Sequence, residues 1–258
     1  MIVYDTYTIF WRELKRYGKS KNGILIRLIQ PVVWIIVIGN TFAGTEPLIQ
    51  SVGFTGEYIE FMTPGVIILT AIFTSIFGGV NTLWDRRYGF MNKALTSPIS
   101  RSSIAIGKMF AISLIAALQA SLIIGIALAI GVSFPNPIMI VPIMAIVVLF
   151  SLGFSGISVT VAATAKSQET FWGIINFLGM PLFMLSPALF PLELLPEWLA
   201  FAAKLNPVTY TILLIRGMMT GVYEGVNSAL SIGIIVVFVI VMIALASYVF
   251  TREVNRPF

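Results

Sequence analysis

The chain of 258 residues contains no cysteine and no histidine. These absences exclude disulfide bonds, metal sites built from thiolates or imidazoles, and cysteine or histidine as a nucleophile or base. Aspartate is nearly absent as well, because Asp5 and Asp85 are the only two. The aspartate-rich motifs that membrane prenyltransferases and two-metal phosphatases need therefore have no residues from which to form.

Charged residues are scarce, at 10% of the chain, whereas soluble domains have about a quarter. Hydrophobic residues make up 58%. So few charges do not cover a globular surface, and we expect an all-α integral membrane protein with several spans. The net charge of +5 predicts no nucleic-acid partner, because membrane proteins collect basic residues on their cytoplasmic side. The charged, amphipathic N-terminus does not have the pattern of a cleavable signal peptide.

Six apolar runs without charge predict six membrane-spanning helices, since a hydrocarbon core of about 30 Å needs roughly 20 apolar residues. We expect them at about residues 24–45, 61–83, 107–131, 138–165, 170–190 and 229–251. A turn at Gly131–Pro137 separates the third from the fourth. Of the 16 basic residues, only Lys204 and Arg216 lie on the outer side of this arrangement. The positive-inside rule then predicts cytoplasmic N- and C-termini in a multi-pass protein of the cell membrane.

Residues 1–23 have the pattern of a basic amphipathic helix. Tyr7, Phe10, Trp11 and Leu14 recur at helical spacing between charged residues. We expect this helix to lie in the cytoplasmic interface, with its aromatic residues in the membrane. A simple membrane anchor and a role in gating are both compatible with the pattern.

The stretch Trp84–Thr96 predicts a short cytoplasmic helix between the second and third spans. Trp84, Tyr88, Met91 and Leu95 share one face of such a helix. This apolar stripe could dock on a partner or rest on the chain's own bundle. The turn Lys166–Glu169, after the fourth span, is too short to suggest more than a reversal of the chain, and a contact surface there has no support from composition.

Between the fifth and sixth spans, prolines and asparagines interrupt the apolar sequence. Unbonded backbone is not tolerated in lipid, so broken helices must be shielded by protein or line a wet cavity. We expect a pair of shallow re-entrant helices at the outer surface, within residues 187–216.

The spans hold almost no ionisable groups, which ion-coupled carriers usually keep at membrane depth. Their polar residues are amides and hydroxyls, such as Gln119 and Ser158, whose expected role is to bond helix to helix. A phosphate-binding loop is absent, because Glu13 occupies the upstream glycine position before Gly18-Lys19-Ser20. If ATP drives transport, a separate polypeptide binds it.

Two ordered motifs resemble a known family. The first is Trp84–Arg101 (WDRRYGFMNKALTSPISR), followed by Gly107-Lys108. The second begins with Leu185–Leu192 (LSPALFPL) and continues through Leu195–Leu199 to Leu205–Tyr210 and Arg216. With the six-span layout, these motifs are similar to the membrane subunit of type-2 ABC exporters, a group that includes multidrug, nodulation-factor and polysaccharide export permeases.

The resemblance implies a single permease domain over residues 1–258, without a cofactor or catalytic residues of its own. Two copies of the permease, expected to be identical, pair around the substrate path, and two ATP-binding subunits hold ATP and magnesium. The first motif becomes a coupling helix seated in a groove of the ATP-binding subunit, and the second closes the outer end of the path. The implied coupling residues are Trp84, Asp85, Arg86, Arg87, Tyr88, Phe90, Met91 and Leu95. The implied outer residues are Ser186, Pro191, Pro196, Asn206 and Pro207.

The chain departs from the family pattern in three places. Arg87 and Asn92 stand where acidic residues are common, so the partner's groove should be acidic or otherwise adapted to a basic helix, and Pro187 replaces a frequent glycine. We expect export of a hydrophobic or amphipathic substrate, and replacement of Met91 and Leu95 by Asp should uncouple a folded permease. Export of a lipid-linked polysaccharide is the nearest alternative. A stand-alone carrier would need charges at membrane depth, and a lipid-modifying enzyme would need clustered carboxylates or a nucleophile with its base. The identity of the substrate is not encoded in any motif.

Overall fold

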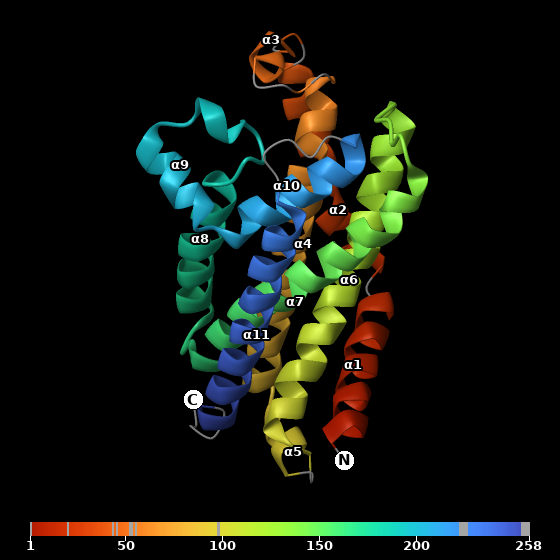
Figure 1. Cartoon of the computed structure of the whole chain (residues 1–258). Coiled ribbons are helices and arrows are strands. Elements are labelled where there is room, and N and C mark those ends of the chain that lie inside the picture. The colour runs from red at the N-terminus through yellow and green to blue at the C-terminus, as the bar shows by residue number, and fades with distance from the viewer. Residues whose placement is uncertain are drawn as a thin grey trace.

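The structure, a computed structural model, describes residues 2–19, 21–42, 44, 46–51, 54, 56–96, 99–221 and 227–253. Within these ranges every α-helix and 3-10 turn belongs to one elongated bundle, and there is no strand (Figure 1). The helices are α1 (Ile2–Lys19), α2 (Lys21–Thr41), α3 (Glu46–Gln50), α4 (Tyr58–Arg87), α5 (Phe90–Leu95), α6 (Arg101–Ile130), α7 (Ile140–Thr164), α8 (Gln168–Met184), α9 (Glu197–Lys204), α10 (Pro207–Thr220) and α11 (Ser228–Glu253). The 3-10 turns are η1 (Pro137–Met139) and η2 (Leu192–Leu194).

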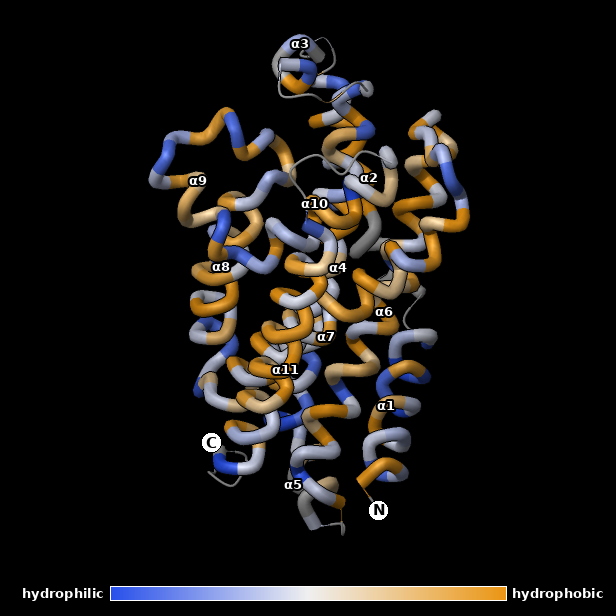
Figure 2. Tube along the Cα trace, viewed as in Figure 1, coloured by the Kyte–Doolittle hydropathy of each residue, from blue (hydrophilic) through white to orange (hydrophobic). Residues whose placement is uncertain are grey.

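Helix α4 forms the centre of the bundle, and α2, α6, α7, α8 and α10 contact it. Most of its side chains are buried, whereas α11 packs on α7 and α6 and turns most of its apolar side chains outward. Hydrophobic residues are spread over the outer faces of the long helices as well as the core (Figure 2). A surface of this kind suits a lipid environment, because no water-facing layer of charge covers it.

The all-helical membrane architecture expected from composition is confirmed. Among the described residues, α4, α6, α7 with η1, and α11 are each long and apolar enough to cross a bilayer. Helices α9 and α10 reach that length only as a pair, and they meet at an angle of 85°. The other two predicted spans, 24–45 and 170–190, are occupied by α2 and by the 17-residue α8. At 1.5 Å per residue, α8 is about 26 Å long and falls short of a full crossing, so six crossings stay a prediction.

The start of α1, the short helix α5 and the end of α11 lie at one end of the bundle, which we call the terminal end (Figure 1). Helices α3 and α9 lie at the other end, which we call the distal end. The beginning and the end of the described chain are thus on the same side, as an even number of crossings requires.

Helix α1 lies lengthwise along α6, parallel to it. Ser103 at the start of α6 bonds the Ile2 carbonyl (3.2 Å), and Gln119 in its middle donates to the Tyr17 hydroxyl (2.9 Å). Close approach is possible because a Cβ at Gly107 would lie only 2.7 Å from the Thr6 carbonyl oxygen. A set of charged contacts, described next, holds α1 in this orientation, and its expected place in the cytoplasmic interface stays a prediction.

Candidate functional site

The predicted helix over 84–96 is divided in the structure. Helix α4 continues through Trp84 to Arg87, the chain turns at Tyr88 and Gly89, and α5 begins at Phe90. Gly89 has φ +75°, a left-handed conformation that glycine adopts without the steric cost a side chain would add. The expectation of one continuous stripe from Trp84 to Leu95 was therefore wrong. Helix α4 ends at Arg87, four residues before Met91, and the turn at Gly89 interrupts the helical periodicity.

An accessible surface at the terminal end is formed by three of the predicted coupling residues, Trp84, Arg87 and Tyr88. We call this surface the aromatic knob. Tyr88 is 76% exposed and stacks on the half-buried Trp84, with 5.2 Å between ring centroids and 8° between planes. The exposed Arg87 lies over the Trp84 ring at 5.9 Å. Tryptophan, tyrosine and arginine are the residue types that dominate protein–protein contacts energetically.

Other predicted coupling residues turn into the protein. Met91 is 2% exposed and packs into the core together with Ala94 of α5. Arg86 donates to the Ala162 carbonyl near the end of α7 (2.7 Å). The expected partner contact by Met91 is thus not available on the isolated chain, and an aspartate there would disrupt the core. The side chain of Leu95 lies outside the described residues.

Asp85 is the centre of a buried ionic cluster that joins α1, α4 and α6. The Lys108 ammonium, 1% exposed, bonds both the Asp85 carboxylate and Glu13 Oε1, the latter at 2.9 Å. Two arginines complete the cluster from α1. Arg12 contacts Glu13 at 2.8 Å and Asp85 at 3.2 Å, and Arg16 contacts Asp85 at 2.9 Å and Glu13 at 2.6 Å. Each buried charge thus has opposite charges beside it, without which burial would be very costly.

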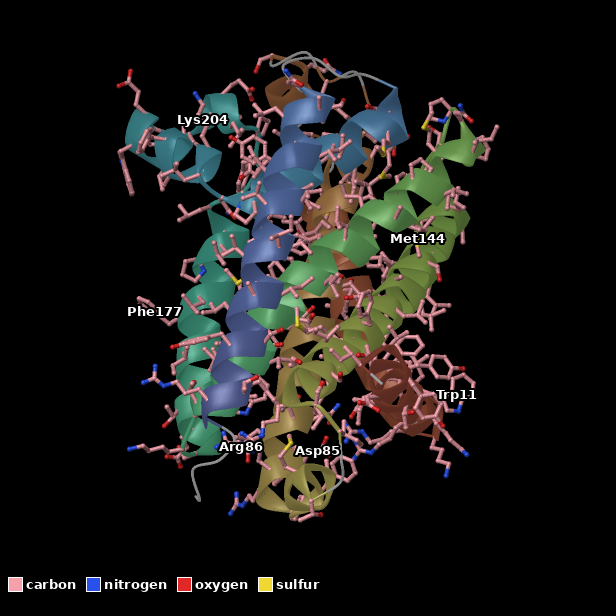
Figure 3. All side chains as sticks on the ribbon, turned by 60° about the horizontal axis from the view of Figure 1, so that its bottom comes forward. Trp11, Asp85, Arg86, Met144, Phe177 and Lys204 are labelled. Atoms are coloured by element: carbon pink, nitrogen blue, oxygen red, sulfur yellow. The ribbon has the colours of Figure 1, made fainter. Side chains whose placement is uncertain are left out.

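The cluster determines how α1 is oriented. Glu13 and Ile9 face α6, whereas Tyr7 and Trp11 are more than half exposed, and Trp11 projects outward in Figure 3. Phe10 and Leu14, also in the predicted apolar face, are half-buried. The outward face of α1 thus presents aromatic rings together with the exposed Lys15 and Lys19, a combination typical of a membrane interface.

Arg12 also connects the cluster to α5. Its guanidinium lies over the Phe90 ring, 3.3 Å from the centroid. A cation and an aromatic face attract each other at this distance. Helices α1, α4, α5 and α6 therefore share one contact network, in which α5 packs against a charged group of α1.

Polar side chains within the spans bond helices to one another, as expected. The Thr74 hydroxyl of α4 donates to Gln119 of α6, and the Ser158 hydroxyl of α7 donates to the Ser75 carbonyl at 2.7 Å. Among the residues that the structure describes, no three acidic side chains gather where a metal could bind.

A pocket of about 330 Å³ opens beside the aromatic knob, between the end of α4 and the turn from α7 to α8. It is lined by Leu83, Trp84, Arg87, Lys166, Ser167 and Gln168. Sequence reasoning gave the Lys166–Glu169 turn no role beyond reversing the chain. Periodicity says nothing about a turn, so only the folded chain could place Lys166 next to Arg87.

At the distal end, side chains satisfy the backbone where α8 stops. Asn206 donates to the carbonyls of Leu182 (2.5 Å) and Leu185 (3.3 Å), while its side-chain oxygen accepts from the Val208 amide at the start of α10 (3.0 Å). Arg216 donates to the carbonyls of Phe61 (3.0 Å) and Pro187 (2.5 Å), and Tyr58 to that of Leu189 (2.9 Å). Apolar surroundings do not supply water, so these donors replace it.

The remaining outer residues shape this break. Ser186 caps its own turn by donating to the Phe183 carbonyl (2.5 Å), Pro191 and Pro196 precede η2 and α9, and Pro207 opens α10. Proline suits the first turn of a helix because the amide it lacks would have no partner there. The structural roles of Tyr58 and Arg216 depend on contacts over more than 100 residues of chain, which no local pattern indicates.

Comparison with known proteins gives the architecture a family. The family model described as ABC-2 type transporter matches residues 4–220. A putative transport permease, ycf38, of Cyanophora paradoxa is 28% identical over 215 residues, 83% of this chain and 73% of the relative. Nodulation protein J of Rhizobium leguminosarum bv. trifolii is 24% identical over 91% of this chain and 87% of its own length. The daunorubicin resistance ABC transporter permease protein DrrB1 of Streptomyces coeruleorubidus is 20% identical over 92% and 83%. With the model matching most of its length, the chain belongs to the ABC-2 type transporter family.

Proposed function

We propose that this chain is the permease subunit of an ATP-driven exporter that moves a hydrophobic or amphipathic substrate out of the cell. Two ATP-binding subunits, which hold ATP and magnesium, energise a pair of identical permeases in the cell membrane. The terminal end of the bundle then faces the cytoplasm. The observation that carries the proposal is the aromatic knob, an accessible Trp-Tyr-Arg surface at the end of the central helix and in the turn that follows it. It lies at the end of the bundle where an ATP-binding subunit would dock.

The ionic cluster supports a route from docking to transport. Asp85 follows Trp84 directly on α4, so a push on the aromatic knob acts on the carboxylate that Lys108, Arg12 and Arg16 hold. Phe90 of α5 acts on the same cluster through Arg12. A packed ionic group has a few discrete arrangements rather than a continuous range, which suits a two-state switch. Binding of ATP by the partner would bias which arrangement is occupied.

A half-buried stripe on α4 supports a substrate path between two copies. One face of the helix carries Phe73, Phe77 and Asn81 and ends at Trp84 of the aromatic knob, and each of these residues is partly exposed in the single chain. Trp172 of α8 lies beside it, with 6.1 Å between the Phe77 and Trp172 ring centroids. A path lined this way accepts apolar groups by contact and offers few hydrogen bonds.

The same aromatic residues favour a second candidate, export of a lipid-linked polysaccharide. Sugar rings stack on aromatic faces, and the stripe presents Phe73, Phe77, Trp84 and Trp172 together. The two candidates differ in the substrate and not in the ATP-binding partner.

Co-purification tests the proposal. The tagged chain is extracted in mild detergent, and bound polypeptides are identified by mass spectrometry. We expect a P-loop ATPase, and we expect Tyr88→Asp to reduce its recovery at least about tenfold, because a charge in a buried aromatic contact costs more than 1.4 kcal/mol. Tyr4→Asp is the matched control, since Tyr4 is 75% exposed, lies at the same end, and is outside the aromatic knob.

A folded permease that retains no ATPase under these conditions would favour a stand-alone carrier instead. For the substrate, daunorubicin, named for the Streptomyces relative, serves as an amphiphilic probe. Stimulation of the complex's ATPase activity by daunorubicin, and its loss in Trp172→Ala, would favour a drug-like substrate. Stimulation by a polyprenyl-linked oligosaccharide alone would favour the second candidate.

A further inference from the structure

One side of α1, next to the ionic cluster, carries four basic residues. Arg12, Lys15, Arg16 and Lys19 follow one another at intervals of three or four residues, so they lie on the same side of the helix. Lys15 and Lys19 are exposed, and the side chains of Arg12 and Arg16 are 31% and 35% exposed. Because α1 packs along α6 at the edge of the bundle, this side is open to the surroundings (Figure 1).

Positive charge exceeds negative charge at this place. In the ionic cluster three cations share the two carboxylates of Glu13 and Asp85. Lys15 and Lys19 stand beside the cluster, and neither ammonium forms an ion pair within the part of the chain that the structure describes. The other carboxylate of α1, Asp5, lies ten residues before Lys15. An anion that approaches this side of α1 therefore meets two unpaired cations, while the carboxylates nearest to it are already bonded.

Aromatic residues continue the same surface toward the start of α1. Tyr7 and Trp11 precede Lys15 and Lys19 at steps of four residues, so the four side chains form one row. Trp11 is 55% exposed and projects outward (Figure 3). Tryptophan and tyrosine are enriched where headgroups meet acyl chains, and basic residues there attract anionic lipids. A row of rings and ammonium groups suits a phospholipid, which has an apolar and an anionic part, better than a soluble anion, which has no apolar part.

We propose that this side of α1 binds an anionic phospholipid, with the headgroup phosphate between Lys15 and Lys19 and beside the exposed edges of Arg12 and Arg16. The headgroup supplies the negative charge that the ionic cluster lacks, so the bound lipid holds α1 against α6. A zwitterionic headgroup carries its own ammonium and does not supply net charge. The inference goes beyond the proposed function and needs no ATP-binding subunit, so its failure would leave the proposed function standing.

Lipid retention by the permease alone tests the site. The tagged chain in mild detergent is incubated with equal amounts of phosphatidylglycerol and phosphatidylcholine, and bound lipids are counted by native mass spectrometry. We expect phosphatidylglycerol to be retained in preference. The double variant Lys15→Gln/Lys19→Gln should lower that preference at least about tenfold, since each basic residue near an anionic lipid adds severalfold to the affinity.

A matched control removes the same number of charges elsewhere. Lys166→Gln/Arg252→Gln takes two exposed positive charges from the same end of the bundle and none from α1. This control should retain phosphatidylglycerol as the wild-type chain does. An equal loss in both double variants would show attraction by net charge alone, and equal retention of the two lipids by the wild-type chain would show no anionic site. Either result would overturn the inference.

Thermal stability supplies a second readout. In mixed micelles, replacing phosphatidylcholine by phosphatidylglycerol should raise the midpoint of unfolding of the wild-type chain by a few degrees, because a ligand that binds only the folded state stabilises it. The midpoint of Lys15→Gln/Lys19→Gln should not respond to this replacement. In phosphatidylcholine it should match the wild-type midpoint, since the two lysines have no ion-pair partner among the described residues.

Three results of the stability measurement would contradict the site. Equal stabilisation of the wild-type chain and the double variant by phosphatidylglycerol would place the lipid elsewhere. A double variant that unfolds early in phosphatidylcholine would show that the lysines support the fold directly. Inorganic phosphate that stabilises the wild-type chain in phosphatidylcholine as much as phosphatidylglycerol does would show a site for a soluble anion instead of a lipid.

Discussion

The surroundings of Asp85 in the structure differ from those expected from the sequence. In the sequence it belongs to a motif of exposed coupling residues, between Trp84 and Arg86. In the structure its carboxylate is buried and bonded by Lys108, Arg12 and Arg16. The neighbouring side chains of a helix point in directions about 100° apart, so Trp84 and Asp85 are adjacent in the chain and yet face different surroundings.

We expect Asp85→Asn to destabilise the protein strongly. The change leaves three cations around the single carboxylate of Glu13, and removing one partner of a buried ion group costs about 3–5 kcal/mol. The midpoint of thermal unfolding in detergent measures the effect. Asp5→Asn is the matched control, because Asp5 is the only other aspartate and lies in the first turn of α1, where a charge is worth about 0.3–1 kcal/mol.

A double variant separates the charge imbalance from the loss of a hydrogen bond. Asp85→Asn combined with Lys108→Met removes one negative and one positive charge, so it should recover part of the stability lost in Asp85→Asn alone. The ionic cluster would not be the cause if the double variant lost more free energy of unfolding than the sum of the losses in the two single variants.

At the scale of elements, Gly89 divides what would otherwise be one helix. The left-handed turn lets α5 fold back so that Met91 and Ala94 pack into the core while Tyr88 stays outside. Without that turn, helical periodicity would place Tyr88 and Met91 on one face. The exposed and buried halves of this segment therefore depend on a single backbone conformation.

We expect Gly89→Ala to cost about 1–2 kcal/mol, since a side chain in the left-handed region is strained, and to reduce ATPase stimulation by the permease. Gly89→Asn should be tolerated better, because asparagine adopts this conformation more readily. Gly125→Ala is the control. Gly125 is within α6 with no atom near its Cβ position, so alanine there should be neutral or stabilising by about 0.5–1 kcal/mol. Equal effects of Gly89→Ala and Gly125→Ala would refute a role for the turn.

Helix α1 is a second case at this scale. Its spacing of aromatic residues correctly indicates two faces, but in a soluble protein the aromatic face would be the buried one. Here the charged face with Glu13 packs against α6, and Trp11 is 55% exposed. An amphipathic pattern indicates that the two faces of a helix meet different surroundings. Which face packs against the protein depends on whether water or lipid surrounds it.

For the whole molecule, the distribution of basic residues between the terminal and distal ends predicts the orientation of the bundle in the membrane. Lys15 belongs to α1, which runs along the terminal half of the bundle (Figure 1). Lys204 lies on α9 at the distal end, far from Asp85 (Figure 3). With no native cysteine, each position can be labelled by itself. We expect Lys204→Cys to react with a membrane-impermeant maleimide in intact cells, and Lys15→Cys to react only after permeabilisation.

Labelling of both positions from outside would contradict cytoplasmic termini. Labelling of Lys15→Cys alone from outside would invert the orientation. The positive-inside rule makes the expected outcome specific, because 14 of the 16 basic residues fall on the side assigned to the cytoplasm.

Much of the fold was predictable because it depends on local composition. Apolar runs located α4, α6, α7 and α11 to within a few residues, and the Gly131–Pro137 cluster predicted the turn between α6 and α7. The end of α8 was less predictable, because it lies at Met184, six residues before the expected end at 190, where contacts rather than charge stop the helix. For the candidate site, sequence indicated Trp84, Arg87 and Tyr88 but not Lys166.

The sequence by itself determined that this protein is a helical membrane protein, and its two motifs indicated a type-2 ABC exporter subunit. Composition suffices for the first of these conclusions, because apolar helices of bilayer length have no other stable medium. Only the tertiary structure decided which residues of the coupling segment are exposed, which charges pair, and which turn lies beside them. Glu13, Asp85 and Lys108 belong to three helices, and Arg216 meets Phe61 across 155 residues. Such contacts arise from packing between distant segments, and no local spacing encodes them.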